Sequence, residues 1–192
     1  MKIIDSIEAA RLFISDRNRA NAGELSQDSI ASTYNESVDK ILNNVRLNGD
    51  QSLIQYTKEF DGVDLNKIQL NHEEINNGAK NVSKDLFDAL KISSQRIYQF
   101  AKETMPSSWF DQDSGLGESV VPMQKVGLYV PGGTAIYPST VLMSAMIAKA
   151  VGVPEIILCT PPKNNGIPDE SILAAAHIAG IDKVYCIGGA QA

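Results

Sequence analysis

The sequence predicts an α/β protein in which a helical amino-terminal region precedes a parallel β-α-β-α-β unit. Residues 1–118 carry 13 of the 17 basic and 19 of the 23 acidic residues, which is typical of solvated helices. Residues 119–192 carry only four of each, together with seven of the eight prolines and eight of the fourteen glycines. We therefore expect two domains, a helical region over 1–118 that ends in a hairpin and an α/β domain over 119–192.

Four segments of the first region combine a capping residue with apolar residues at helical spacing: 5–17, 26–49, 50–62 and 83–106. Ser26 and Ser83 are the expected caps of the second and fourth helices, and Pro106 stops the fourth. Residues with this spacing are the expected core positions: Ile30, Tyr34, Val38, Ile41, Val45, Leu53, Ile54, Tyr56, Phe60, Leu86, Phe87, Leu90, Ile97, Phe100 and Ala101. A short extended piece is expected around Ile68 and Leu70, and a hairpin over 109–121.

Apolar runs at 126–130, 155–160 and 183–187 predict three strands of the second region. Helices are predicted between them: Ser139 caps one through Val151 that Gly152 stops, and Pro168, Asp169 and Glu170 start one that Gly180 ends. Strands that are apolar almost throughout are typical of parallel sheets, which implies helices on both faces. The 139–151 helix is apolar almost all round, as expected for a helix enclosed in protein.

Composition excludes several classes of partner. The net charge is −6 and the pI is near 4.9, which argues against nucleic acid and anionic membrane surfaces as partners. No run reaches the ~18 consecutive apolar residues of a membrane helix, and the first residues lack the apolar core of a signal peptide. Cys159 and Cys186 both lie in strand-like runs, as in a reduced protein. We expect a soluble, cytoplasmic chain.

Two of the predicted strands end in glycine pairs, Gly132-Gly133 and Gly188-Gly189. Glycine at the carboxyl end of a parallel strand lets a ligand approach the backbone closely, so the two pairs predict a shared cleft. Ordinary turns between strand and helix explain them as well, and the two interpretations have about equal weight. Neither pair belongs to a G-x-G-x-x-G fingerprint or a P-loop.

Side chains that could act as catalytic groups or metal ligands are few in this sequence. His177 lies among alanines and is more simply a packed or half-exposed histidine than a catalytic one, while His72 precedes two glutamates on a solvated face. The two histidines and two cysteines lack zinc-site spacing, and neither cysteine has an evident activating neighbour. These residues indicate a cleft without catalytic machinery.

Two sequence blocks carry a resemblance to a known family. VGLYVPGGTA at 126–135, followed by Tyr137-Pro138-Ser139, and GGAQA at 188–192 resemble histidinol dehydrogenases. Tyr56-Thr57-Lys58 and the FDGV run at 60–63 are similar to the same family's amino-terminal region. The resemblance implies an incomplete Rossmann-like, aldehyde-dehydrogenase-like fold in a homodimeric, NAD-dependent zinc enzyme. Such an enzyme oxidises L-histidinol to L-histidine through an aldehyde.

The resemblance also implies that Tyr129 and Gln191 contact NAD. The family's zinc ligands and its catalytic Glu-His pair are expected beyond Ala192, so we expect no catalytic or metal-binding residue in this chain and interpret it as an amino-terminal part. Without the resemblance, Tyr129 is more simply a strand aromatic packed on the next helix, and Gln191 an exposed terminal residue. Two alternatives are a non-catalytic α/β binding module and another aldehyde-dehydrogenase-like oxidoreductase with a catalytic cysteine.

Overall fold

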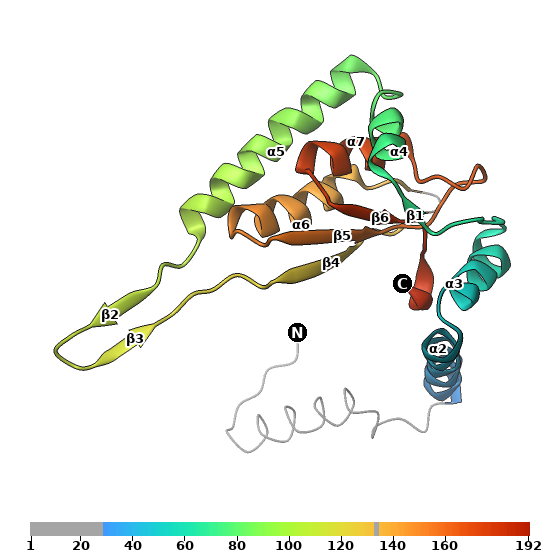
Figure 1. The fold of residues 1–192 in the computed structure, drawn as a ribbon, viewed down its shortest axis with the longest axis horizontal. Coiled ribbons are helices and arrows are strands. Elements are labelled where there is room, and N and C mark those ends of the chain that lie inside the picture. The colour runs from blue at the N-terminus through green and yellow to red at the C-terminus, as the bar shows by residue number, and fades with distance from the viewer. Residues whose placement is uncertain (1–28, 133–134) are drawn as a thin grey trace, which may run out of the picture.

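The computed structural model describes residues 29–132 and 135–192, with side chains from residue 36 onward (Figure 1). The helix expected over 5–17 and the cap Ser26 lie outside the described residues. The remaining elements of the first region are α2 (Ser29–Asn48), α3 (Asp50–Tyr56), the π-helical turn η1 (Thr57–Asp61), β1 (Gln69–Leu70), α4 (His72–Ala79), α5 (Lys84–Thr104), β2 (Trp109–Asp111) and β3 (Leu116–Glu118). The second region contains β4 (Lys125–Tyr129), α6 (Pro138–Ala150), β5 (Glu155–Cys159), α7 (Glu170–Ala179), β6 (Lys183–Tyr185) and the short 3₁₀ helix η2 (Gly189–Gln191).

Local sequence signals place most of the helix ends. Gly49 and Gly62 adopt left-handed φ angles of 57° and 69° at the ends of α2 and η1, a conformation that favours glycine. The Ser83 hydroxyl accepts a hydrogen bond from the Leu86 backbone N–H at 3.3 Å, which caps α5 as expected. Asn71 and Glu74 form a reciprocal capping box at the start of α4.

The predicted parallel unit is confirmed. Strand order is β1-β6-β5-β4, and both β4–β5 and β5–β6 are parallel pairs. Strand β1 extends the sheet on the far side of β6, where it runs antiparallel with Gln69 opposite Tyr185. The sheet is therefore mixed, because the short extended piece around Leu70 joins it.

Helices cover one face of this sheet. Helices α4, α5, α6 and α7 lie together on the same side in Figure 1. Ile156, Leu158 and Val184 point into that layer and are fully buried, whereas Ile157 and Tyr185 on the opposite face are only half-buried. The expectation of helices on both faces is wrong for the described residues, because every helix that packs on the strands does so from one side.

Several expected core positions are wrong as well. Val38, Phe60, Leu86 and Phe100 are exposed, with Phe60 at 53% and Phe100 at 68%. Helix α6 is not enclosed either, because Ile147 is 50% exposed. The part of each helix surface that contacts neighbouring elements is narrower than the surface covered by its apolar residues. The apolar residues at the margins of that contact therefore reach solvent.

The predicted hairpin is present as β2 and β3, with Trp109 opposite Glu118. It projects away from the body of the molecule in Figure 1, and both of its strands are exposed along their whole length. The hairpin connects α5 to β4, so the first region leads directly into the edge strand of the sheet.

Candidate functional site

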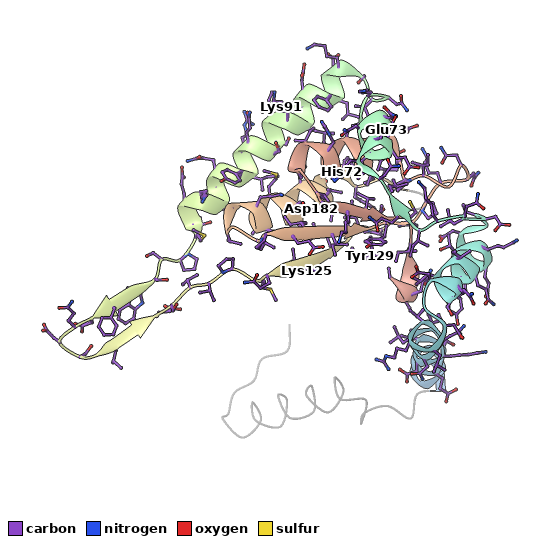
Figure 2. The ribbon with its side chains drawn as sticks, viewed as in Figure 1. His72, Glu73, Lys91, Lys125, Tyr129 and Asp182 are labelled. Atoms are coloured by element: carbon purple, nitrogen blue, oxygen red, sulfur yellow. The ribbon has the colours of Figure 1, made fainter. Side chains whose placement is uncertain are left out.

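The carboxyl edge of the sheet brings Tyr129 next to the turn that follows β6. The Gly189 backbone N–H donates a hydrogen bond to the Tyr129 hydroxyl at 3.1 Å, although the two residues are 60 positions apart in the sequence. Parallel strands end at the same edge, so the loops after β4 and β6 can meet there. Tyr129, labelled in Figure 2, lies opposite Cys159 on the face away from the helices and is 49% exposed. It is therefore not a strand aromatic packed on the next helix.

The backbone conformation of Gly189 favours glycine. Its φ angle is +68°, which side chains of L-residues rarely permit. A Cβ at this position would also lie 2.6 Å from the Gln191 Oε1 atom, so the Gln191 side chain would have to shift. The turn thus depends on glycine chiefly to bend the backbone.

Gln191 ends this turn with an unsatisfied side chain. The residue is 6% exposed, so it is not an exposed terminal residue. Its buried Oε1 and Nε2 atoms have no hydrogen-bond partner among the described residues. A buried, unpaired amide costs about 1–3 kcal/mol, and such groups usually have a partner. The Gln191 amide is therefore a buried polar group at this edge whose hydrogen-bonding capacity is unused by the described residues.

Gly132 and Gly188, one residue from each glycine pair, both pack against the loop that follows β5. A Cβ at Gly132 would lie 2.7 Å from Pro161 Cγ, and one at Gly188 would lie 2.8 Å from Pro161 Cβ. The loops after β4 and β6 therefore converge on the loop after β5, which makes a common edge as predicted. Packing against Pro161 by itself accounts for glycine at both positions.

A hollow of about 540 Å³ lies beside this edge, between the loop after β5 and the end of η1. Gly132, Asp61, Lys163 and Glu170 are among its lining residues. Burial raises the pKa of the Asp61 carboxyl, whose Oδ2 atom has no partner among the described residues. Sequence patterns did not point to this hollow, because its walls come from segments about 100 residues apart.

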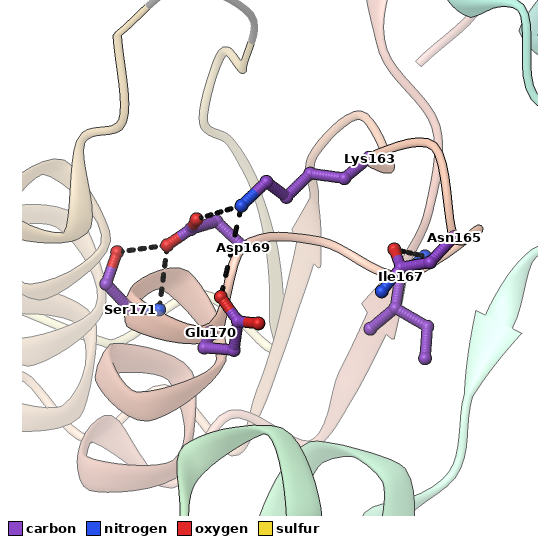
Figure 3. A network of polar contacts seen from close by, with 6 residues as sticks. All are labelled: Lys163, Asn165, Ile167, Asp169, Glu170 and Ser171. Atoms are coloured by element: carbon purple, nitrogen blue, oxygen red, sulfur yellow. Dashed lines mark hydrogen bonds and ion pairs between the residues drawn. The ribbon is translucent and has the colours of Figure 1, made fainter. Parts of the chain in front are cut away.

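Lys163 and Asp169 order the loop that forms one wall (Figure 3). The Lys163 ammonium lies 2.7 Å from Asp169 Oδ2 and 3.9 Å from a Glu170 oxygen. Burial by itself would raise the pKa of Asp169, but hydrogen bonds from Lys163 and Ser171 outweigh it and lower that pKa. The lysine charge is therefore largely neutralised within its own loop.

Two other residues that the sequence singled out, Cys186 and His177, lie in different surroundings. Cys186 is fully buried, and burial raises the pKa of its thiol to about 12. His177 is exposed, its Nδ1 atom lies 2.7 Å from Asn76 Oδ1, and its ring lies 6.3 Å from the Phe87 ring. Over 29–132 and 135–192, no group of three His, Cys, Asp or Glu residues could hold a metal ion.

Within the same ranges, no helix is long and apolar enough to span a membrane.

These features define a class: an α/β protein whose candidate ligand site lies at the carboxyl ends of parallel strands. The family model for histidinol dehydrogenase matches residues 25–192, and the chain therefore belongs to the histidinol dehydrogenase family. The histidinol dehydrogenase of Oceanobacillus iheyensis is 44% identical over 174 residues, which are 86% of this chain and 41% of that protein. The histidinol dehydrogenase of Aquifex aeolicus is 41% identical and matches over 90% of this chain and 39% of its own length.

A solved structure supports the fold. The crystal structure of histidinol dehydrogenase from Elizabethkingia anophelis superimposes with a TM-score of 0.76 at 31% sequence identity. The superposition covers 82% of this chain and 37% of that one. This chain thus spans about two fifths of the length of the relatives it matches.

Proposed function

We propose that this chain forms the NAD-contacting part of a histidinol dehydrogenase that oxidises L-histidinol to L-histidine through an aldehyde. The observation that carries the proposal is the hydrogen bond between Tyr129 and Gly189, next to the unpaired amide of Gln191. This hydrogen bond joins the 126–135 block, which contains Tyr129, to the 188–192 block, which contains Gln191. The resemblance of these two blocks to the family implies the NAD contacts. Family membership supports the same reaction.

The residues at the edge suit a dinucleotide. The half-exposed ring and hydroxyl of Tyr129 can contact a flat, polar ligand, and the Gln191 amide can both donate and accept a hydrogen bond. When bound, NAD would accept the hydride released by the substrate alcohol. In this proposal Tyr129 and Gln191 hold the cofactor, and neither residue takes up the proton of the alcohol.

Zinc chemistry is not assigned to these residues. The described part offers no metal-binding cluster, so the residues present do not fit a zinc site. We place the zinc ligands and the acid–base pair of the proposed reaction in the part of the relatives' polypeptide that lies outside the match to this chain. A cytoplasmic homodimer acting on L-histidinol, without nucleic acid or membrane partners, completes the proposal.

A cysteine-dependent, aldehyde-dehydrogenase-like mechanism is not favoured by the structure. Nucleophilic cysteines need a lowered pKa and access to substrate. Burial raises the pKa of Cys186 to about 12, and burial also raises the pKa of Cys159. The non-catalytic binding module has no specific observation in its favour.

The test is a chimaera in which residues 25–192 replace the matching segment of the Oceanobacillus iheyensis relative. We expect histidinol-dependent NADH formation, measured by absorbance. Tyr129→Ala and Gln191→Ala should each raise the KM for NAD by about 3- to 10-fold, since one hydrogen bond is worth ~0.5–1.5 kcal/mol.

Matched controls are Tyr98→Ala and Gln99→Ala, because both residues lie on α5, away from the carboxyl edge of the sheet. They should leave the KM for NAD unchanged. A folded chimaera without NADH formation would refute the proposed reaction, and equal effects of site and control substitutions would refute the assigned contacts.

A further inference from the structure

A second hollow, of about 480 Å³, lies where the end of α4 and the start of α5 meet α7. These three helices lie next to one another in Figure 1, on the covered face of the sheet. Tyr129 lies on the opposite face, and the hollow shares no lining residue with the one beside the carboxyl edge. It is therefore separate from the candidate cofactor site.

Gly78 allows α4 to lie directly on α7 at this point. A Cβ at Gly78 would overlap Leu173 Cδ1, and Leu173 is fully buried, so a side chain at position 78 would push the helices apart. The close approach brings Asn76 beside His177, 101 positions further along the chain, with Asn76 Oδ1 2.7 Å from His177 Nδ1. An amide oxygen only accepts, so Nδ1 is the donor.

The other ring nitrogen of His177, Nε2, has no partner among the described residues. With the hydrogen on Nδ1, Nε2 of the neutral ring has a free lone pair and can accept a hydrogen bond. A ligand that donates an O–H or N–H to this atom would satisfy it.

Phe87 provides an aromatic wall beside this nitrogen. Its ring centroid lies 6.3 Å from that of His177, and the two planes are tilted by 40°. Phe87 and Val82 are half-buried and pack against the core, so this wall is held in place. Aromatic rings attract one another at centroid distances of about 4.5–7 Å, and a planar ligand ring can therefore pack here.

The charge of the hollow is positive. Lys80 and Lys84 both line it, and the lining formed by described residues contains no Asp or Glu. Lys84 pairs with Asp88 one turn later in α5, which offsets its charge. The Lys80 ammonium has no ion-pair or hydrogen-bond partner in the described part of the chain. One unmatched positive charge suits a ligand with one negative charge.

We propose that this hollow binds a small aromatic monocarboxylate, with its carboxylate at Lys80, its ring against Phe87 and a ring hydroxyl donating to His177 Nε2. The proposal is independent of the proposed oxidation of histidinol, because it uses a different face of the molecule. It assigns this region a second ligand site, apart from the cofactor contacts.

The test is a titration of ¹⁵N-labelled residues 1–192 with 4-hydroxyphenylacetate, followed by NMR. We expect saturable shifts of backbone amides in 76–87 and next to His177, at millimolar ligand. Phenylacetate, which lacks the hydroxyl, should bind about 3-fold more weakly. 4-Hydroxyphenylacetamide, which lacks the charge, should bind about 5-fold more weakly, and acetate should not saturate.

Two substitutions assign the contacts. Lys80→Gln should weaken 4-hydroxyphenylacetate to the level of its amide and leave the amide unaffected. Lys40→Gln is the matched control, because Lys40 is also an exposed lysine without an ion pair among the described residues, and it lies on α2. His177→Phe keeps a ring but removes Nε2, so 4-hydroxyphenylacetate and phenylacetate should then bind equally.

Several results would overturn the proposal. They are absence of saturation, equal affinity for the carboxylate and its amide, and equal effects of Lys80→Gln and Lys40→Gln. Shifts confined to the surroundings of Tyr129 and Gln191 would also overturn it, because the ligand would then occupy the candidate cofactor site. If Lys80→Gln unfolds, as its NMR spectrum would show, the comparison of carboxylate and amide on the unsubstituted chain decides.

Discussion

At the scale of single residues, burial decides which groups are reactive. Cys186 follows β6 and is enclosed by the core, where a thiolate would lose its hydration. Burial therefore raises the pKa of its thiol to about 12. Cys159 lies on the uncovered face of the sheet, and partial burial raises its pKa too. Both cysteines are structural in this part of the chain.

We expect the raised pKa of Cys186 to make its thiol react with alkylating reagents much more slowly than an ordinary thiol. With a pKa of about 12, only about one Cys186 thiol in 10⁴ is ionised at pH 8, compared with roughly a quarter for a thiol of pKa 8.5. In a Cys159→Ser variant, iodoacetamide should therefore modify Cys186 at least about 1,000-fold more slowly in the folded chain than in urea. Mass spectrometry measures the rate, and rapid modification of the folded chain would contradict the prediction.

At the scale of elements, the loop between β5 and α7 is held by one carboxylate. Asp169 Oδ1 accepts hydrogen bonds from the Ser171 N–H at 2.9 Å and its hydroxyl at 2.6 Å. Its other oxygen pairs with Lys163 (Figure 3). The same residue thus caps α7 and fixes the wall of the hollow.

Asp169→Ala should lower the free energy of unfolding by about 1–2 kcal/mol at pH 7, because the cap is lost. The pKa of Asp169 is below its ordinary value of 3.8 in the folded state, so the unfolded chain binds the proton more readily. The stabilisation is therefore complete well above pH 3.8 and disappears as the pH falls through the folded pKa. Urea unfolding at pH 7 and at pH 3 measures the change.

Asp113→Ala is the control, since Asp113 is an exposed aspartate in the hairpin turn. It should change stability by less than about 0.5 kcal/mol at either pH. A difference between Asp169→Ala and the unsubstituted chain that is equally large at pH 3 would show that the carboxylate charge is not responsible.

At the scale of the whole molecule, the described residues form two layers, a sheet and the helices that cover one of its faces. The helices cover one face of the sheet, the other face is open, and β4 ends at an unpaired edge. Tyr129 stands at the carboxyl end of that edge strand. In doubly wound sheets a ligand lies at the carboxyl ends of the strands, so the proposed cofactor contacts belong to this edge.

We expect residues 1–192 to bind NAD weakly. A hydrogen bond and an aromatic contact each contribute about 0.5–1.5 kcal/mol, whereas even a millimolar complex needs about −4 kcal/mol after the cost of association. Calorimetric titration should show no saturation at millimolar NAD, and histidinol should yield no NADH. Tight binding or turnover by this chain would contradict the prediction.

Local signals predicted the elements better than their burial. The Ser83 cap, Gly49 and Gly62 each act within a few residues, and all three lie where the sequence placed them. Phe60 and Phe100 fit helical stripes but are exposed, because burial depends on which neighbours arrive. The pairing of β1 with β6 was not predicted, because a two-residue strand carries no periodic signal.

Within the candidate site, Tyr129 and Gln191 were predicted only through the resemblance to a family. Tyr129 and Gln191 have no local pattern that distinguishes them from a strand aromatic and a surface amide. The structure places the turn containing Gln191 against Tyr129 and buries the Gln191 amide without a partner. The cofactor contacts themselves stay a proposal.

The sequence by itself determined the Ser83 cap, the glycine turns, the succession of the parallel strands along the chain and the family. These properties arise from short-range sterics and hydrogen bonding, or from residue identity. The predicted Ser139 cap of α6 is wrong, because α6 begins at Pro138 after Tyr137 and has no side-chain cap. Only the tertiary structure decided that the helices share one face, that β1 joins the sheet, that β4 keeps a free edge and that Gly189 meets Tyr129. Those outcomes depend on contacts between residues far apart in the chain, whose free energy is realised only when the whole core packs.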